Sequence, residues 1–274
     1  MNELLANPAV QAGVVPALVG LIAAAALART RLLVLSPLAA FVAVVALAIG
    51  LSFEPMTTVR KVVVCTLLAG GAAVLLDALG VAPSRWLRGL LALAAAGAAL
   101  WVGARVLQQL EGAALWTKAL VLAAFAAALV STFVATAGDT LRSLVVATVL
   151  GFNAGLLALL GASASQAFMG IGLGAASGVA ALWLMVRGPS APATRFLLLP
   201  LLAFAALAPM VASLTGGLSF YALLPLLAVA PATTLLKAPG RALWQQALLA
   251  GGPAVLPMLL SLALAWFRVG AASA

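Results

Sequence analysis

The chain has 274 residues, of which 66% are hydrophobic and only 7% are charged, with a formal net charge of +9. A soluble globular domain carries about 25% charged residues, so this composition excludes a water-soluble fold and predicts an all-α, polytopic helix bundle in a lipid bilayer. The basic residues stand singly or in pairs between apolar runs, which is typical of membrane-protein loops and argues against nucleic acid as a partner.

The residue types limit the available chemistry. The sequence has no histidine, the commonest general base and a usual ligand of haem and zinc, so we expect no metal site and no cofactor. The single cysteine, Cys65, lies in an apolar run and cannot form an intrachain disulfide. We interpret it as a small buried residue rather than a reactive thiol.

Ten apolar stretches of about the length that crosses a bilayer follow one another along the chain. The boundary between the fourth and the fifth is the least distinct, so the number of transmembrane helices lies between eight and ten. All connections are short, and we expect a single transmembrane domain over residues 1–274. The stretches are 8–28, 32–53, 62–82, 89–106, 114–137, 143–162, 166–187, 196–216, 219–236 and 242–267.

The distribution of Lys and Arg predicts the orientation. Nine of them lie in the odd-numbered connections, and five lie in the even-numbered connections or at the termini. Cytoplasmic loops are richer in Lys and Arg, so we expect the odd-numbered connections in the cytoplasm and both termini outside it. The first residues lack the basic start of a cleaved signal peptide, so the first stretch is interpreted as a retained helix. The Ala-, Leu- and Gly-rich composition favours a bacterial inner (plasma) membrane.

Two acidic residues near the ends of predicted helices are candidate substrate-binding residues, because ionisable groups in a bilayer are costly. Glu54 lies at the outer end of the second stretch. It is expected to pair with Arg60 or Lys61, or else to form a substrate or proton site at the outer mouth. Asp77 lies about a turn and a half inside the third stretch. Its expected partners are Arg85 or Arg88 at the interface, or Lys237 across the bundle.

Short matches indicate an internal repeat. The segment TRLLVLSPLAAF at 30–41 resembles TRFLLLPLLAF at 194–204, and APSRWLRGLL at 82–91 resembles APGRALWQQALL at 238–249. Because six helices separate the two copies, the repeat would be parallel. Chance similarity in an Ala- and Leu-rich chain is the alternative. The two copies would be residues 8–106 and 166–267, and the connecting helices residues 114–162.

Two polar residues belong to the sixth stretch. Asp139 precedes it, between Gly138 and Arg142, and is expected to cap its first turn. Asn153 is the polar side chain closest to the centre of a predicted span. Its amide needs a partner away from lipid, and we expect a hydrogen bond to another helix, with a ligand contact as the alternative.

Three glycines, Gly170, Gly174 and Gly178, recur at every fourth residue in the seventh stretch. A phosphate-binding loop would need a strand before it and a helix after it, whereas these glycines lie inside a run of membrane-spanning length. They form one bare stripe on a helix, as in a glycine zipper. The stripe predicts close packing against another helix, in the same chain or in a second protomer.

Prolines are concentrated in the last three stretches, where each interior proline frees a backbone carbonyl. Interrupted helices are tolerated at membrane depth where they line a cavity, so this region is the expected binding site. Kinks that only shape the packing are the alternative. The candidate residues are Pro209, Ser213, Pro231, Thr233 and Thr234.

Three function classes remain. A permease or flippase is favoured by the ten spans, the possible repeat and the clustered prolines. The scarcity of buried carboxylates argues against a proton- or sodium-driven pump and favours a hydrophobic, lipid-like or weakly polar substrate. The second is a non-catalytic membrane subunit that acts with a partner subunit or as a homo-oligomer. The third is an intramembrane lipid-modifying enzyme, which would need Glu54 and Glu111 to converge. We expect membrane lipids as partners and assign no catalytic residue.

Overall fold

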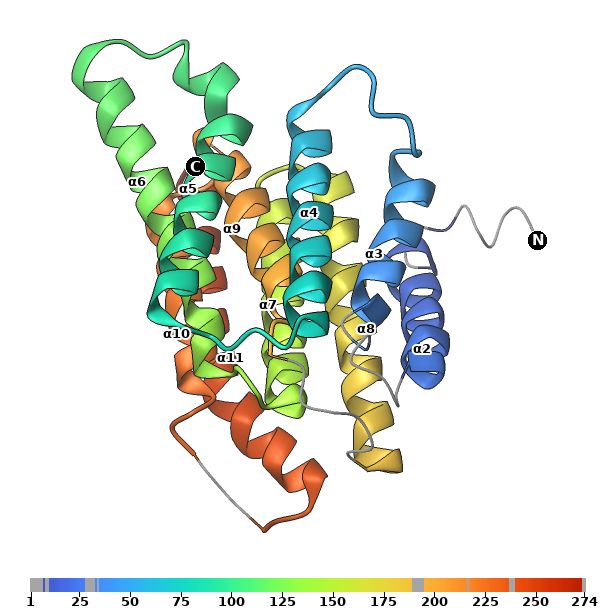
Figure 1. Cartoon of the computed structure of the whole chain (residues 1–274). Helices are drawn as coiled ribbons and strands as arrows, with labels where there is room; N and C mark the ends of the chain where they lie inside the picture. Colours follow the sequence, from blue (N-terminus) through green and yellow to red (C-terminus); the bar gives the residue numbers. More distant parts are fainter. Residues whose placement is uncertain are drawn as a thin grey trace.

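The computed structural model describes residues 7, 10–27, 33, 35–188, 195–215, 217–236 and 240–272, and its described secondary structure is entirely helical (Figure 1). This confirms the all-α fold. Short π and 3-10 segments (η1, Val10–Val14; η3, Thr132–Ala135; η4, Phe220–Leu223) accompany the α-helices. The α-helices are α2 (Val15–Leu27), α3 (Leu35–Ala48), α4 (Thr58–Ala78), α5 (Arg85–Leu107), α6 (Gly112–Ser131), α7 (Thr140–Leu160), α8 (Ala164–Arg187), α9 (Leu199–Leu214), α10 (Leu226–Ala232) and α11 (Leu243–Ala272).

Each of the ten predicted apolar stretches overlaps one of these α-helices, and the helix ends differ from the predicted bounds by several residues. Six helices of the described chain are long and apolar enough to cross a bilayer, namely α4, α5, α6 with η3, α7, α8 and α11. The chain is therefore a multi-pass membrane protein. The other apolar helices are shorter: α3, with 14 residues, rises about 21 Å against a hydrocarbon core of about 30 Å.

Polar side chains accept otherwise unpaired main-chain N–H groups at the starts of α4, α5 and α7. Ser84 accepts from Leu87 N at 3.1 Å at the start of α5. Asp139 accepts from Arg142 N at 2.9 Å at the start of α7, and its second oxygen lies 3.5 Å from the Arg142 guanidinium. The cap predicted at Asp139 is therefore confirmed.

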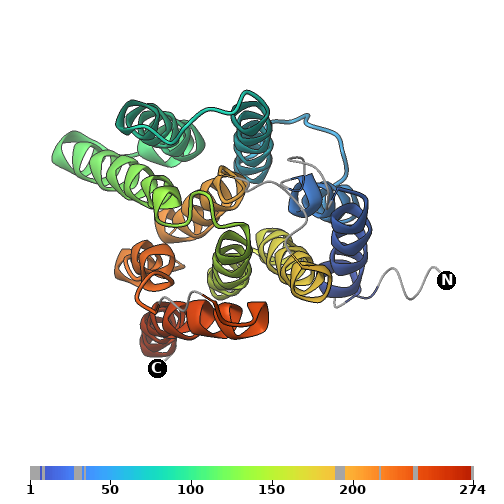
Figure 2. The same ribbon diagram turned by 60° about the horizontal axis from the view of Figure 1, so that its bottom comes forward.

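The centre of the bundle is formed by α7 and α8, which pack against each other more extensively than any other pair of described elements. Figure 2 shows α7 enclosed by α8, α9 and α11. About 72% of the apolar window of α7 is buried, against 17% for α11, so α7 is enclosed by the protein and α11 lies at the periphery of the bundle.

Bare backbones meet where α7 and α8 touch. A Cβ placed on Gly170 would lie 2.5 Å from Gly155 N, and one on Gly151 would lie 2.5 Å from Gly174 N. Real side chains never come so close, so the helices approach each other only because these positions are glycine. Dispersion and Cα–H···O contacts hold such pairs together in lipid. Gly178 has more room, with nothing closer than 3.4 Å.

The other helices surround this pair in two groups (Figure 2). On one side, α2 and α3 pack against α8. On the other side, α9 packs between α4 and α7, the α5–α6 hairpin packs against α9, and α10 and α11 lie beyond α7. Phe41 of α3 and Phe204 of α9 join the two groups through an edge-to-face contact with ring centroids 5.8 Å apart.

No internal repeat is evident among the described helices. The repeat would make α2 and α3 equivalent to α8 and α9, yet the first two pack extensively and the last two scarcely touch. It would also equate the 21-residue α4 with η4 and the seven-residue α10. The apolar letters of the matches are what an Ala- and Leu-rich chain supplies by chance, and part of the matched segments lies outside the described residues.

Candidate functional site

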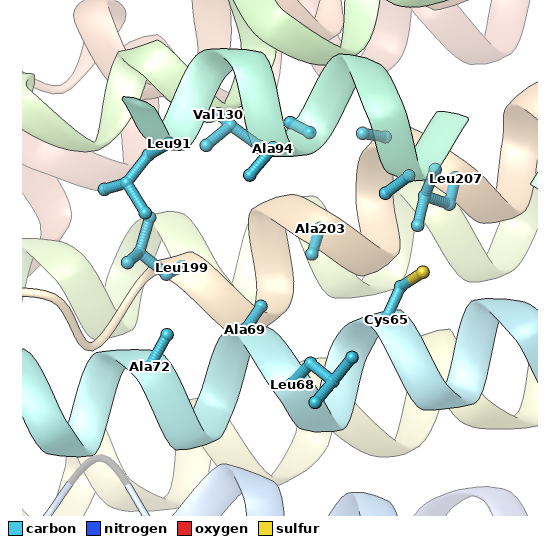
Figure 3. Close-up of a pocket in the computed structure, with 13 residues that line it drawn as sticks. Cys65, Leu68, Ala69, Ala72, Leu91, Ala94, Val130, Leu199, Ala203 and Leu207 are labelled. Carbon is cyan, nitrogen blue, oxygen red and sulfur yellow. The ribbon is translucent and has the colours of Figure 1, made fainter. Parts of the chain in front are cut away.

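An apolar cavity of about 300 Å³ lies between α4, α5 and α9 (Figure 3). Small-molecule pockets in proteins begin at about this size. Each of these three helices supplies four lining residues and α6 supplies Val130. The lining is aliphatic apart from the thiol of Cys65, so it offers no strong hydrogen-bonding side chain.

The cavity exists because small side chains face one another across it. Ala69 of α4, Ala94 of α5 and Ala203 of α9 lie on its three walls (Figure 3). Helices α4 and α5 are joined by a short connection but pack little against each other, and α9 forms the wall behind the gap. Alanine leaves this space unfilled where leucine would close it.

The cavity opens sideways. Leu68 lines it and is 68% exposed, and Ala94 lines it and is also exposed. In a bilayer this flank of the protein faces acyl chains, because α4 and α5 are both of membrane-spanning length. An apolar molecule can therefore reach the cavity from the hydrocarbon without crossing water.

A basic side chain bridges α4 and α5 at the end of the cavity where Cys65 lies. Lys61 Nζ donates to the Trp101 carbonyl at 3.0 Å and stands 5.2 Å from the centroid of its indole ring. Lys61 was a predicted partner of Glu54. Glu54 is exposed and makes no ion pair with a described residue, and Arg60 donates to the Pro55 carbonyl at 2.7 Å. The predicted pairing of Glu54 is therefore wrong, because both cations find carbonyl acceptors.

Asp77 holds the opposite end together. Asp77 is 5% exposed, and its carboxylate accepts from Arg195 N at 2.9 Å and from Phe196 N at 3.4 Å, just before α9 begins. The Arg195 guanidinium in turn donates to the Val81 carbonyl at 3.3 Å, in the connection from α4 to α5. Asp77 therefore joins two walls of the cavity through main-chain groups. Its predicted partner Lys237 lies outside the described residues.

Three arginines, Arg85, Arg88 and Arg195, are exposed at this same end. Arg85 lies 5.7 Å from the centroid of the Trp86 ring. Arg88 precedes the lining residue Leu91 by one helical turn, and Arg195 precedes the lining residue Leu199. The cavity thus has an apolar interior and a group of three arginines, Arg85, Arg88 and Arg195, at the end away from Cys65, which we call its basic end.

Asn153 is fully buried in α7, and neither its amide oxygen nor its amide nitrogen has a hydrogen-bond partner among the described residues. The predicted hydrogen bond to another helix is therefore not present. Gln166 and Ser177 of α8 are likewise buried and unpartnered in this part of the chain. Such groups cost about 1–3 kcal/mol each, and none of the three lines the cavity.

The proline-rich candidates use their hydroxyls locally. Ser213, Thr233 and Thr234 each donate to the carbonyl three residues earlier, at 2.9, 2.7 and 2.7 Å. Pro209 lies inside α9 and Pro231 inside α10. None of these five residues lines the apolar cavity, and of the last three predicted helices only α9 contributes to it.

No group of His, Cys, Asp and Glu that could hold a metal ion is present within the described ranges. Comparison with protein-family models, with curated proteins and with solved structures found no match. The chemistry of the cavity and of its two ends is therefore the basis for assigning a function.

Proposed function

We propose that the chain is a permease or flippase that takes a hydrophobic, lipid-like molecule from the bilayer into the cavity between α4, α5 and α9. The observation that carries this proposal is the aliphatic lining of a cavity that opens sideways past Leu68 and Ala94. A polar substrate would lose its hydrogen bonds to water there and gain none, at a cost of several kcal/mol. An aliphatic chain from the bilayer has no hydrogen bond to lose, and it exchanges dispersion contacts with lipid for dispersion contacts with the lining.

The two ends of the cavity supply a route for exchange between the leaflets. The contact of Lys61 with Trp101 lies beyond one end, and the contact of Asp77 with Arg195 and Phe196 lies beyond the other. Alternating access requires one end to open while the other stays closed. A hydrogen bond to a charged group contributes about 1.5–3 kcal/mol net, so the Lys61 end, with one such bond, opens at lower cost than the Asp77 end, with two.

We place the Asp77 end in the cytoplasmic leaflet of a bacterial inner membrane. Arg85, Arg88 and Arg195 lie at that end, and Lys and Arg are enriched on the cytoplasmic side of membrane proteins. The hydrogen bond between Asp77 and Arg195 N supports this placement, because it puts the third and seventh connections on the same face of the bundle.

Lipid movement in reconstituted vesicles tests the proposal. The variant Ala203→Phe fills the cavity from α9, whereas the matched control Ala128→Phe adds the same side chain to an exposed position of α6 outside the cavity. Dithionite quenching of a fluorescent phospholipid reports its transbilayer movement. We expect Ala203→Phe to fall to the rate of protein-free vesicles and Ala128→Phe to retain the wild-type rate.

Two outcomes would contradict the proposed function. Wild-type transport by folded Ala203→Phe, verified by size-exclusion chromatography and thermal unfolding, would show that the cavity is not the route. If the wild-type chain moves no lipid but co-purifies with a stoichiometric membrane protein, the chain is instead a non-catalytic subunit of a complex.

A further inference from the structure

We propose that the basic end of the cavity binds the phosphate headgroup of an anionic amphiphile, with Arg88 and Arg195 as its ligands and the apolar chain of the same molecule in the cavity. This inference rests on the proposed function, because it names the class of molecule that the cavity takes. Two observations support it: the arginines lie at one end of the cavity, and the charge at that end is positive.

Three helix ends meet at this site. Helix α4 ends one residue after Asp77, α5 begins at Arg85, and Arg195 comes just before α9. The bond from Arg195 N to Asp77 and the bond from the Arg195 guanidinium to the Val81 carbonyl place Arg195 against the connection from α4 to α5. The arginines therefore belong to one end of the cavity although they are far apart in sequence.

The helix register brings Arg88 to the same place. Arg88, Leu91 and Ala95 are spaced by three and four residues, so they share one face of α5, and the last two line the cavity. At 1.5 Å per residue, Arg88 lies about 4.5 Å beyond Leu91 along the helix. Figure 3 shows Leu91 beside Leu199 at the end of the cavity opposite Cys65. Arg88 therefore lies beyond the α5 wall and Arg195 beyond the α9 wall, both at the same end of the cavity.

The charge at this end is positive and available to a ligand. Asp77 is the carboxylate that contacts Arg195, and it is buried with its oxygens accepting main-chain N–H groups. Asp139, at the start of α7, is instead paired with Arg142. Three exposed guanidinium groups against the Asp77 carboxylate leave the end cationic. Guanidinium groups bind phosphate oxygens in a bidentate manner, and the N-terminus of α5 adds a favourable helix dipole.

The experiment measures the binding of two pyrene-labelled phospholipids, phosphatidylglycerol and phosphatidylcholine with the same acyl chains, to the purified chain in neutral detergent. We expect wild type to bind phosphatidylglycerol at least about tenfold more tightly, since hydrogen bonds to charged groups contribute more than neutral ones. Arg88→Gln and Arg195→Gln should each lose most of this preference. The control Arg241→Gln, exposed at the start of α11, should keep it.

Equal affinity of wild type for the two lipids would overturn the headgroup site but not the proposed role of the cavity. Failure of wild type to bind either lipid would contradict the proposed function itself. The same loss of preference in Arg241→Gln would reduce the effect to general surface charge and also overturn the site. Displacement of the labelled lipid by millimolar inorganic phosphate would show that free phosphate, not an amphiphile, is the ligand. Arg88→Gln alone carries the test if Arg195→Gln does not fold.

Discussion

The main-chain N–H of Arg195 donates to the carboxylate of Asp77 at 2.9 Å, and this bond joins the end of α4 to the start of α9. The contact resembles an N-terminal helix cap, except that the capping side chain comes from a different helix. An unpaired N–H group in a bilayer costs several kcal/mol, so the carboxylate stabilises the segment that leads into α9. It also sets the separation of two walls of the cavity.

Removal of the Asp77 carboxylate should destabilise the bundle. We predict that Asp77→Ala lowers the free energy of unfolding by about 2–4 kcal/mol, because two main-chain N–H groups lose a charged acceptor. Asp77→Asn keeps one acceptor oxygen and should cost about half as much. The control Asp139→Ala removes a local cap and should cost about 1 kcal/mol. Unfolding in mixed micelles measures all three, and wild-type stability of Asp77→Ala would contradict this role.

The contact between α7 and α8 predicts a sharp difference between two glycines of one stripe. Gly170→Ala places a Cβ against the α7 backbone and should cost about 1–3 kcal/mol, whereas Gly178→Ala finds room and should be close to neutral. Gly174→Leu should separate the helices and lower the thermal stability further. Equal unfolding temperatures for Gly170→Ala and Gly178→Ala would show that the close approach does not limit stability.

Cys65 makes the cavity accessible to chemical labelling, since it is the only cysteine in the sequence and lines the cavity. We predict that an apolar maleimide added to proteoliposomes modifies Cys65 many times faster than a charged methanethiosulfonate, because access is from the lipid. A long-chain phospholipid that fills the cavity should slow the apolar reagent. Mass spectrometry of the intact protein measures both rates, and faster labelling by the charged reagent would indicate a water-filled route.

The contact between Lys61 and Trp101 joins α4 and α5 beyond the end of the cavity near Cys65, and we propose that it restricts access there. Lys61→Gln shortens the side chain and removes the charge, so we expect the charged reagent to label Cys65 several times faster than in wild type. The matched control Lys118→Gln changes an exposed lysine of α6 outside the cavity and should leave the rate unchanged. Identical rates in the two variants would assign the closure to other residues.

The buried amide of Asn153 separates a structural role from a binding role. If its only effect is on folding, Asn153→Leu should stabilise the bundle by about 1–3 kcal/mol, because an unpartnered amide is replaced by an apolar side chain. We predict this gain, together with wild-type lipid movement. A stable Asn153→Leu protein without transport would identify Asn153 as a ligand-binding residue.

The sequence predicted best what depends on local composition. The ten apolar stretches coincide with helices because length and hydrophobicity are direct requirements of the bilayer. The Asp139 cap was predictable from its neighbours. The glycines of α7 that face α8, Gly151 and Gly155, were not recognised, although they are spaced four residues apart like the stripe that they meet.

The cavity could not be predicted in the same way. Its alanines are indistinguishable in the sequence from the many alanines that pack tightly or face lipid, because an opening depends on how three helices diverge. The partner of Asp77 could not be predicted from the sequence for a different reason. It is a main-chain group 118 residues away, and main-chain donors leave no mark in the pattern of side chains.

The glycine contact between α7 and α8 also determines where this protein can flex. Two backbones in direct contact have no side chains between them that could change rotamer, so α7 and α8 form a rigid central pair. The α5–α6 hairpin is different, since its helices pack extensively on each other, less on α9 and only slightly on α4. We therefore expect the hairpin to move as a rigid body relative to a stationary α7–α8 pair. Distances measured by paired spin labels should then change across the α4–α5 gap and stay constant between α7 and α8.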